Sequence, residues 1–218
     1  PPRPPPPPPP AEFSLFVRKE GTRLTRLGEP YRFVGANLWQ GMHLGAEKEA
    51  GGDRERLVRE LDRMKESGVE NLRVMAASEG PDTEPWFTLS TLSHQPTPWR
   101  VLPSMQPRPG LYNDGVVAGL DFLLVELARR DMTAVLVLGN MWPWSGGFAQ
   151  YVSWATGLPV PPPGARGTFE TARYLKFAKA FFNTKDAMTP WLRHVRFVVT
   201  RTNAISGVAY RDDPTIMA

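Results

Sequence analysis

The feature of this sequence that most restricts its fold is the regular alternation of short apolar runs with longer amphipathic segments. The clearest run, from Thr133 to Leu138, is apolar at almost every position, as expected for a strand buried on both faces. Repeated strand–helix–strand order predicts parallel strands joined by right-handed crossovers. The predicted strands are 31–37, 69–75, 133–138 and a fourth that begins at 215, and the predicted helices are 53–67, 113–130, 169–182 and 190–201.

Two kinds of α/β fold fit this order, a doubly wound sheet and a TIM barrel. No Gly-rich phosphate fingerprint follows the first strand, where the sequence reads Gly35-Ala36-Asn37-Leu38-Trp39. The segments after the strands, 76–112 and 139–167, are long and aromatic, which favours a barrel with its functional face at the carboxyl ends of the strands. A complete (β/α)8 barrel has eight strands and about 250 residues, so we expect about the first four strands here.

The chain divides into two parts by composition. Nine of the first ten residues are proline, which predicts a stiff polyproline II segment. We assign 1–12 to a proline-rich low-complexity tail, with a ligand for an SH3-like or WW-like groove as the alternative. We assign 13–218 to the half-barrel, which begins with a hairpin from Phe13 to Leu24 that turns at Glu20-Gly21. Because the chain begins at Pro1 and stops at Ala218 inside an apolar stretch, we expect it to be a fragment.

Composition excludes several classes of function. The chain has 26 Lys and Arg against 22 Asp and Glu, spread along its length, so the charge does not indicate nucleic-acid binding. It has no cysteine, which excludes a disulfide, a thiolate metal site and a cysteine nucleophile. No apolar run approaches the ~20 residues of a membrane span. His43, His94 and His194 lack metal-ligand spacing, and no serine elbow is present. We therefore expect no metal, cofactor, nucleic-acid or membrane partner.

Polar and aromatic residues gather where the predicted strands end. Aromatic planes stack on the apolar faces of sugar rings while amide and guanidinium groups bond the hydroxyls, so this rim predicts a carbohydrate site; packing of the long loops is the alternative role for the tryptophans. Arg73 lies inside an apolar strand, where a buried guanidinium requires a partner, usually an active-site carboxylate in a barrel. A surface arginine on an edge strand is the alternative. The rim residues are Asn37, Trp39 and His43, then Arg73, Glu79 and Trp86, then Asn140, Trp142, Trp144 and Tyr151.

A glycosidase generally needs two carboxylates, about 5–5.5 Å apart in the retaining geometry. Glu79, Asp82 and Glu84 share one loop, and we interpret them as solvated loop charges. Asp212 and Asp213 precede a strand, at the wrong end of a barrel, and Asp213-Pro214 is typical of a turn. The residues alone therefore predict a sugar-binding rim without a catalytic pair.

Longer stretches carry a family resemblance. In order and spacing, residues 13–218 resemble the amino-terminal half of glycoside hydrolase family 5 endo-β-1,4-mannanases, the mannan endo-1,4-β-mannosidases. The matching stretches are 33–39, 71–80, Gln106-Pro107, Tyr112-Asn113, 119–122, 140–142, Gly146-Gly147, 150–154, 201–203 and 210–218.

The resemblance implies roles for five residues. Arg73 corresponds to the family's active-site arginine, which supports the nucleophile. Trp142 corresponds to an aromatic that lines the glycone cleft, with Asn140 beside it, and Asn37 and Trp39 approach the same cleft. The family's Asn-Asn-Trp element reads Asn140-Met141-Trp142 here, so one asparagine is replaced.

The resemblance also explains the missing carboxylates. In the family, a Trp-Glu-Leu-x-Asn-Glu-Pro stretch directly follows the segment that ends here at Ala218, so both catalytic glutamates lie beyond this chain. It implies a secreted, extracellular, retaining hydrolase of internal bonds in mannan, glucomannan or galactomannan, without a cofactor. We expect the isolated chain to be inactive; the alternative is a non-catalytic polysaccharide-binding half-barrel or pseudoenzyme.

Overall fold

A computed structural model describes residues 15–82, 87–89, 96–98, 100–164 and 167–218 of the chain. The proline-rich tail, and with it Glu84, Trp86 and His94, lies outside the described residues. Three parallel strands form the central sheet in the order β4 (Val34–Asn37), β5 (Val69–Met75) and β8 (Thr133–Val137). The segment 215–218 lies along the other edge of β8. Ala134 N donates to Thr215 O at 2.7 Å, and Met217 N donates to Ala134 O at 2.8 Å. The predicted order is confirmed for three parallel strands, and 215–218 pairs with β8 in parallel, as the predicted start of a fourth would.

Helices connect the strands on one face of the sheet. The helix α2 (Arg54–Glu66) follows β4, and α3 (Asp114–Arg129) follows β5. Each begins where the sequence predicts, because Asp53 accepts a hydrogen bond from Arg56 N at 2.9 Å and Asn113 accepts one from Val116 N at 3.2 Å. Their apolar stripes pack with Leu72 and Val74 in one core.

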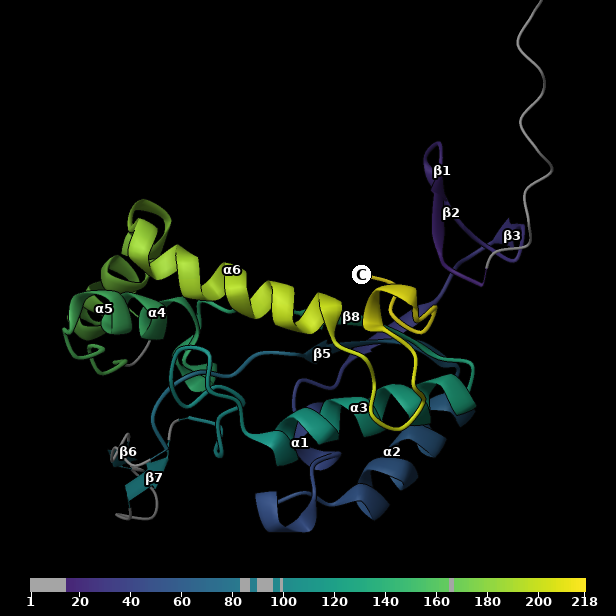
Figure 1. Ribbon diagram of the computed structural model, residues 1–218, viewed down its shortest axis with the longest axis horizontal. Coiled ribbons are helices and arrows are strands. Elements are labelled where there is room, and N and C mark those ends of the chain that lie inside the picture. The colour runs from purple at the N-terminus through teal and green to yellow at the C-terminus, as the bar shows by residue number, and fades with distance from the viewer. Residues whose placement is uncertain (1–14, 83–86, 90–95, 99, 165–166) are drawn as a thin grey trace, which may run out of the picture.

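The third connection contains more helix than the sequence indicates. The structure adds α4 (Gly147–Thr156) within the predicted loop 139–167, followed by α5 (Phe169–Lys179) and η3 (Ala180–Asn183). α6 (Lys185–Thr200) begins before Pro190, which lies inside it. Its carboxyl-terminal half reaches the main core through Phe197 and Val198. Figure 1 shows α4 and α5 at one end of the molecule and α6 running back toward the sheet.

Smaller elements complete the described chain. The predicted hairpin is confirmed as β1 (Arg18–Glu20) and β2 (Arg23–Arg26), and β3 (Glu29–Pro30) extends this antiparallel sheet. It projects from the end of the molecule opposite to α4 and α5 (Figure 1). The others are α1 (Gly41–Leu44), η1 (Lys48–Ala50), β6 (Phe87–Leu89), β7 (Pro96–Pro98), η2 (Pro143–Ser145) and η4 (Tyr210–Asp212).

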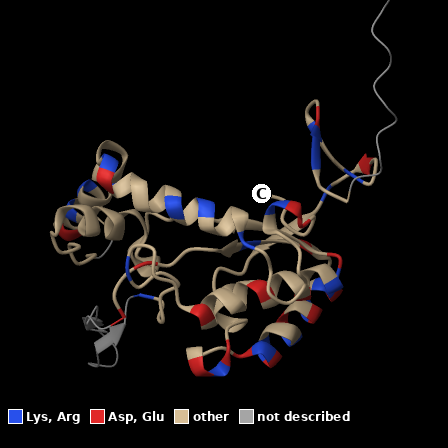
Figure 2. Ribbon diagram, in the orientation of Figure 1, with Lys and Arg blue, Asp and Glu red and all other residues tan. Residues whose placement is uncertain are grey.

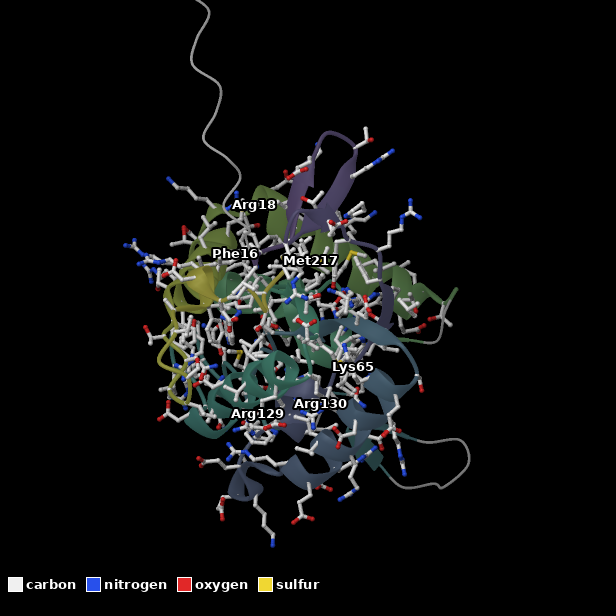
Figure 3. The ribbon with its side chains drawn as sticks, turned by 90° about the vertical axis from the view of Figure 1, so that its right-hand side faces the viewer. Phe16, Arg18, Lys65, Arg129, Arg130 and Met217 are labelled. Carbon is white, nitrogen blue, oxygen red and sulfur yellow. The ribbon has the colours of Figure 1, made fainter. Side chains whose placement is uncertain are left out.

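Lys, Arg, Asp and Glu residues are spread along α2, as Figure 2 shows, whereas α3 is mostly apolar. At one end of the two helices Arg130 bonds Asp62 of α2 at 2.7 Å and Glu126 of α3 at 2.6 Å, and Figure 3 shows Lys65, Arg129 and Arg130 together there. No helix in the described ranges is long and apolar enough to cross a membrane.

Candidate functional site

The carboxyl ends of the strands bring Asn37 and Arg73 together. The two residues are register partners on β4 and β5, and Arg73 is in turn the register partner of Val135 on β8. Alternation along β5 puts Leu72 and Val74 into the helix-side core, so Arg73 lies on the opposite, barrel-interior face.

The prediction that Arg73 is buried against a carboxylate is wrong for this chain. The Arg73 side chain is exposed, and within the described part of the chain it makes no hydrogen bond or ion pair. The physical reason is the open half-barrel. Nearer the amino-terminal ends of the strands, interior side chains do contact one another, because Asn71 Nδ2 donates to Thr133 Oγ1 at 2.7 Å and lies 3.5 Å from Met217 Sδ. Met217 lies near the middle of the view in Figure 3.

Aromatic residues from two strand ends meet on the rim. Trp39 follows β4 and Trp144 follows β8, and their ring centroids lie 5.0 Å apart in an edge-to-face arrangement. Trp39 is 40% exposed, so one part of its ring packs against Trp144 while the other faces solvent. Trp144 therefore packs within the long loops, whereas part of the Trp39 ring is accessible to a ligand.

Among the rim tryptophans that the structure describes, Trp142 is the most exposed, at 56%. The turn around it is held by Asn140, whose Oδ1 accepts the Trp142 N–H at 3.1 Å and whose carbonyl accepts the Phe148 N–H at 2.8 Å. Asn140 therefore uses its side-chain oxygen to shape the turn, and its NH2 group is the part that can donate to a ligand. The sequence predicts that both residues lie on the rim, but it does not predict that the Asn140 side-chain oxygen is used within the turn.

Glu79 differs from the prediction. It was expected to be a solvated loop charge, but its exposure is 1%, because the loop after β5 folds beneath the turn 140–147. Gly147 N donates to Glu79 Oε2 at 2.8 Å, and the Tyr151 hydroxyl donates to Glu79 Oε1 at 3.2 Å. Burial raises the pKa of Glu79 to about 7, while the bonds from Gly147 and Tyr151 and the charge of Arg100 act in the opposite direction.

Asp82 agrees with the prediction only in being exposed. Its Oδ1 accepts the Ser104 N–H at 2.8 Å, so it caps a loop rather than standing free in solvent. Asp213 does the same at the start of the fourth strand, where its Oδ1 accepts the Thr215 N–H at 2.9 Å, which confirms the predicted turn. Both carboxylates therefore accept hydrogen bonds from backbone N–H groups.

A chain of buried hydrogen bonds runs from Glu79 to α6. Tyr151 Oη lies 3.1 Å from Gln106 Oε1, Gln106 Nε2 donates to Tyr112 Oη at 3.2 Å, and Tyr112 Oη lies 3.3 Å from His194 Nδ1. His194 Nε2 lies 3.0 Å from the Ala76 carbonyl, which can only accept, so Nε2 carries the proton and Nδ1 accepts from Tyr112. Burial lowers the pKa of His194 to about 4, consistent with a neutral ring.

Sequence reasoning missed this chain of bonds. No spacing rule connects Gln106, Tyr112 and His194, because they come together only when the loop after β5 packs on α4 and α6. His43, a rim candidate, is half-buried; its Nε2 lies 3.1 Å from Pro103 O, and desolvation lowers its pKa to about 4. In the described ranges, no group of three or more His, Asp or Glu side chains is arranged to hold a metal ion.

Comparison with known proteins places this geometry in a family. The model of the family described as GH family 5 beta-mannosidase-like matches residues 14–218. The chain is 43% identical to a glycoside hydrolase family 5 mannosidase from Rhizomucor miehei, with a TM-score of 0.83 over 94% of this chain and 48% of that one. A variant of that mannosidase has been solved in complex with mannosyl-fructose.

Curated plant relatives match as well. Mannan endo-1,4-beta-mannosidase 1 of Solanum lycopersicum is 31% identical over 93% of this chain and 42% of its own length. Mannan endo-1,4-beta-mannosidase 1 of Oryza sativa subsp. japonica is 31% identical over 93% of this chain and 39% of its own length. The chain thus spans less than half the length of these relatives, as four strands of a (β/α)8 barrel would. With its match over residues 14–218, the chain belongs to the glycoside hydrolase family 5 β-mannosidase-like family.

Proposed function

We propose that this chain forms the substrate-binding, amino-terminal half of a retaining glycoside hydrolase that cleaves internal β-1,4-mannosidic bonds of mannans. The observation that carries the proposal is the rim itself. Trp142 and Trp39 expose aromatic surface after the carboxyl ends of β8 and β4, the edge of the sheet at which Asn37 and Arg73 also lie and where barrel enzymes hold their substrates. The plant relatives, named as mannan endo-1,4-beta-mannosidases, support mannan, glucomannan or galactomannan as the substrate class.

The catalytic carboxylates are not supplied by the two acidic residues of the second loop that the structure describes. Glu79 has no solvent access and Asp82 is bonded to Ser104 N, so neither is free to protonate or attack a sugar. Arg73 is free to support a carboxylate contributed from the remaining strands. We therefore propose that residues 1–218 alone are inactive, because a retaining hydrolysis requires both an acid/base and a nucleophile.

A second candidate is a mannosidase that removes terminal mannose. It is favoured by the 43% identity to the Rhizomucor miehei mannosidase, which exceeds the identity to the plant endo-enzymes quoted above. Because polymeric mannans do not cross membranes, we also propose an extracellular location, to be tested by detecting the protein in the culture medium of its source cells.

A chimera tests the proposed function. Residues 14–218 replace the matching half of the Rhizomucor miehei mannosidase, which then supplies the second half of the barrel. We expect the chimera to hydrolyse β-1,4-mannohexaose with retention of anomeric configuration, and Arg73→Ala to reduce its kcat by about 100-fold. Mannobiose with mannotetraose, or mannotriose, as the first products indicates internal cleavage, and mannose with mannopentaose indicates the second candidate. A folded chimera that hydrolyses neither the terminal nor the internal bonds of mannohexaose contradicts the proposal.

A further inference from the structure

Glu79 joins the loop after β5 to the turn that carries Trp142. Its backbone N–H donates to Ser145 O at 2.8 Å, and its carboxylate accepts the Gly147 N–H at 2.8 Å. Between these two bonds, a Cβ on Gly146 would lie 1.9 Å from Glu79 O, so the two backbones are in direct contact. Glu79 therefore contacts this turn through both its main chain and its side chain, in addition to the bonds that Asn140 makes within it.

The same turn determines where Trp142 lies. The Trp142 carbonyl accepts a bond from Ser145 Oγ at 3.4 Å, and Gly146 N donates to Pro143 O at 3.0 Å. Gly146 and Gly147 both have positive φ angles, of 82° and 59°, so the turn has an unusual backbone that requires outside support. Glu79 provides that support at Ser145 and Gly147, and the short turn transmits it to Trp142.

The surroundings of the carboxylate exclude solvent and so favour its neutral form, which raises its pKa. Of the nearby phenols, Tyr151 of α4 bonds the carboxylate, whereas Tyr174 of α5 donates to Met141 O at 2.9 Å. Burial raises the pKa of both, and that of Tyr112 to about 12. Arg100 is the charged neighbour, and its guanidinium donates to Gln150 Oε1 and to Pro81 O at 3.1 Å each. His194 lies further along the chain of bonds, through Tyr112, and is neutral near pH 7 because its pKa is low.

We propose that Glu79 is a positioning residue that fixes the Trp142 turn for stacking on a sugar ring. The identity of the sugar rests on the proposed function. The positioning of the turn by Glu79 rests only on the hydrogen bonds described above. Glu79 itself contacts no sugar, because it is buried beneath Gly147 and Tyr151.

Three variants of the full chain test this role. Glu79→Ala removes both side-chain bonds, Glu79→Gln keeps the size and one acceptor but removes the charge, and Glu66→Gln on the exposed last turn of α2 is the matched control. Two readouts are followed: the Gly147 amide resonance against pH, and the Trp142 indole resonance with and without β-1,4-mannohexaose. Trp142→Phe assigns the indole signal.

We expect the Gly147 amide to titrate with a midpoint near pH 7 in the wild type and in Glu66→Gln, and not in Glu79→Gln. We expect Glu79→Ala to shift the Trp142 indole signal without sugar and to weaken mannohexaose binding about tenfold or more, as misplacement of a binding group does. If Glu79→Ala does not fold, Glu79→Gln is compared with Glu66→Gln and the wild type instead.

The two proposals fail separately. If the wild type binds no mannohexaose but Gly147 titrates and the indole shifts in Glu79→Ala, the proposed function is overturned while the positioning role is supported. If Gly147 does not titrate and the Glu79 variants match Glu66→Gln in indole signal and affinity, the positioning role is overturned.

Discussion

At the scale of single residues, the described chain is held by buried carboxylates that bond distant segments. Asp121 is fully buried in α3, and its Oδ1 accepts from Arg201 Nε at 2.9 Å and from Tyr210 Oη at 2.6 Å. Its Oδ2 accepts the Ala204 N–H at 3.2 Å. This one side chain therefore fixes the loop that leads from α6 to the fourth strand.

Asp121→Ala is expected to lower the free energy of unfolding by about 3–5 kcal/mol, because it leaves the Arg201 guanidinium and the Tyr210 hydroxyl without their acceptor. Urea denaturation measures the change. Asp62→Asn is the control, since Asp62 pairs with Arg130 at an exposed position, 53% for its side chain, and is expected to cost less than about 1 kcal/mol. Equal losses in the two variants would contradict the role of Asp121.

Residue types alone predict the rim but not its support. Asn37, Trp39, Asn140 and Trp142 follow from their places after strands, because parallel strands end at one edge of a sheet. Glu79 was misjudged because a carboxylate in a Pro- and Gly-containing loop is usually solvated. Its burial depends on Gly147 and Tyr151, which lie far along the sequence, and no local pattern records such a contact.

At the scale of elements, strands and capped helices could be predicted, whereas α4 could not. The helix begins at Gly146-Gly147 without a side-chain cap, so the sequence carries no start signal there. The structure replaces the missing cap with Glu79, whose carboxylate accepts the first N–H of the helix. A carboxylate at that place also complements the helix dipole.

Gly146→Ala is expected to destabilise the fold by about 2 kcal/mol or more, because the new Cβ would lie 1.9 Å from Glu79 O and the φ of 82° disfavours alanine. Gly157→Ala, at the other end of α4, is the matched control. It has a φ of 71° but nothing within 4 Å of its Cβ, so we expect a cost of about 1 kcal/mol. Thermal and urea unfolding compare the two; a Gly146 variant as stable as the Gly157 variant would refute the close contact.

At the scale of the whole molecule, stability depends on pH through three groups whose pKa values are shifted by desolvation. The pKa of Glu79 in the fold is raised from 4.5 to about 7, so its contribution is fully present below pH 4.5 and is lost as the pH rises through 7. His43 and His194 act in the opposite direction, because their pKa values fall from 6.5 to about 4 and the fold loses stability as the pH drops below 6.5.

Glu79→Gln isolates one of these groups. Both histidines are common to the variant and the wild type, so the difference in unfolding free energy reports Glu79. We expect it to move in favour of the variant by about 3 kcal/mol between pH 4.5 and pH 8. Urea denaturation across this range gives the curve, and a pH-independent difference would show that Glu79 is not buried as described.

The four parallel strands also explain what the whole chain exposes. Val34 on β4 is 62% exposed, and Arg73 faces an interior that four strands leave open. The sequence indicates the barrel through its element order, but the exposure of Arg73 depends on which strands are present and is not encoded in the residues around it.

The most direct test of the account is binding of β-1,4-mannohexaose to the chain by isothermal titration calorimetry, with cellohexaose as the control sugar and Trp142→Ala as the control protein. We expect the wild type to bind mannohexaose in preference to cellohexaose without cleaving it. We expect Trp142→Ala to lose about tenfold in affinity, as removal of an exposed stacking aromatic does. Equal binding of the two sugars, or unchanged affinity in Trp142→Ala, would contradict the assignment of the rim as a mannan-binding surface.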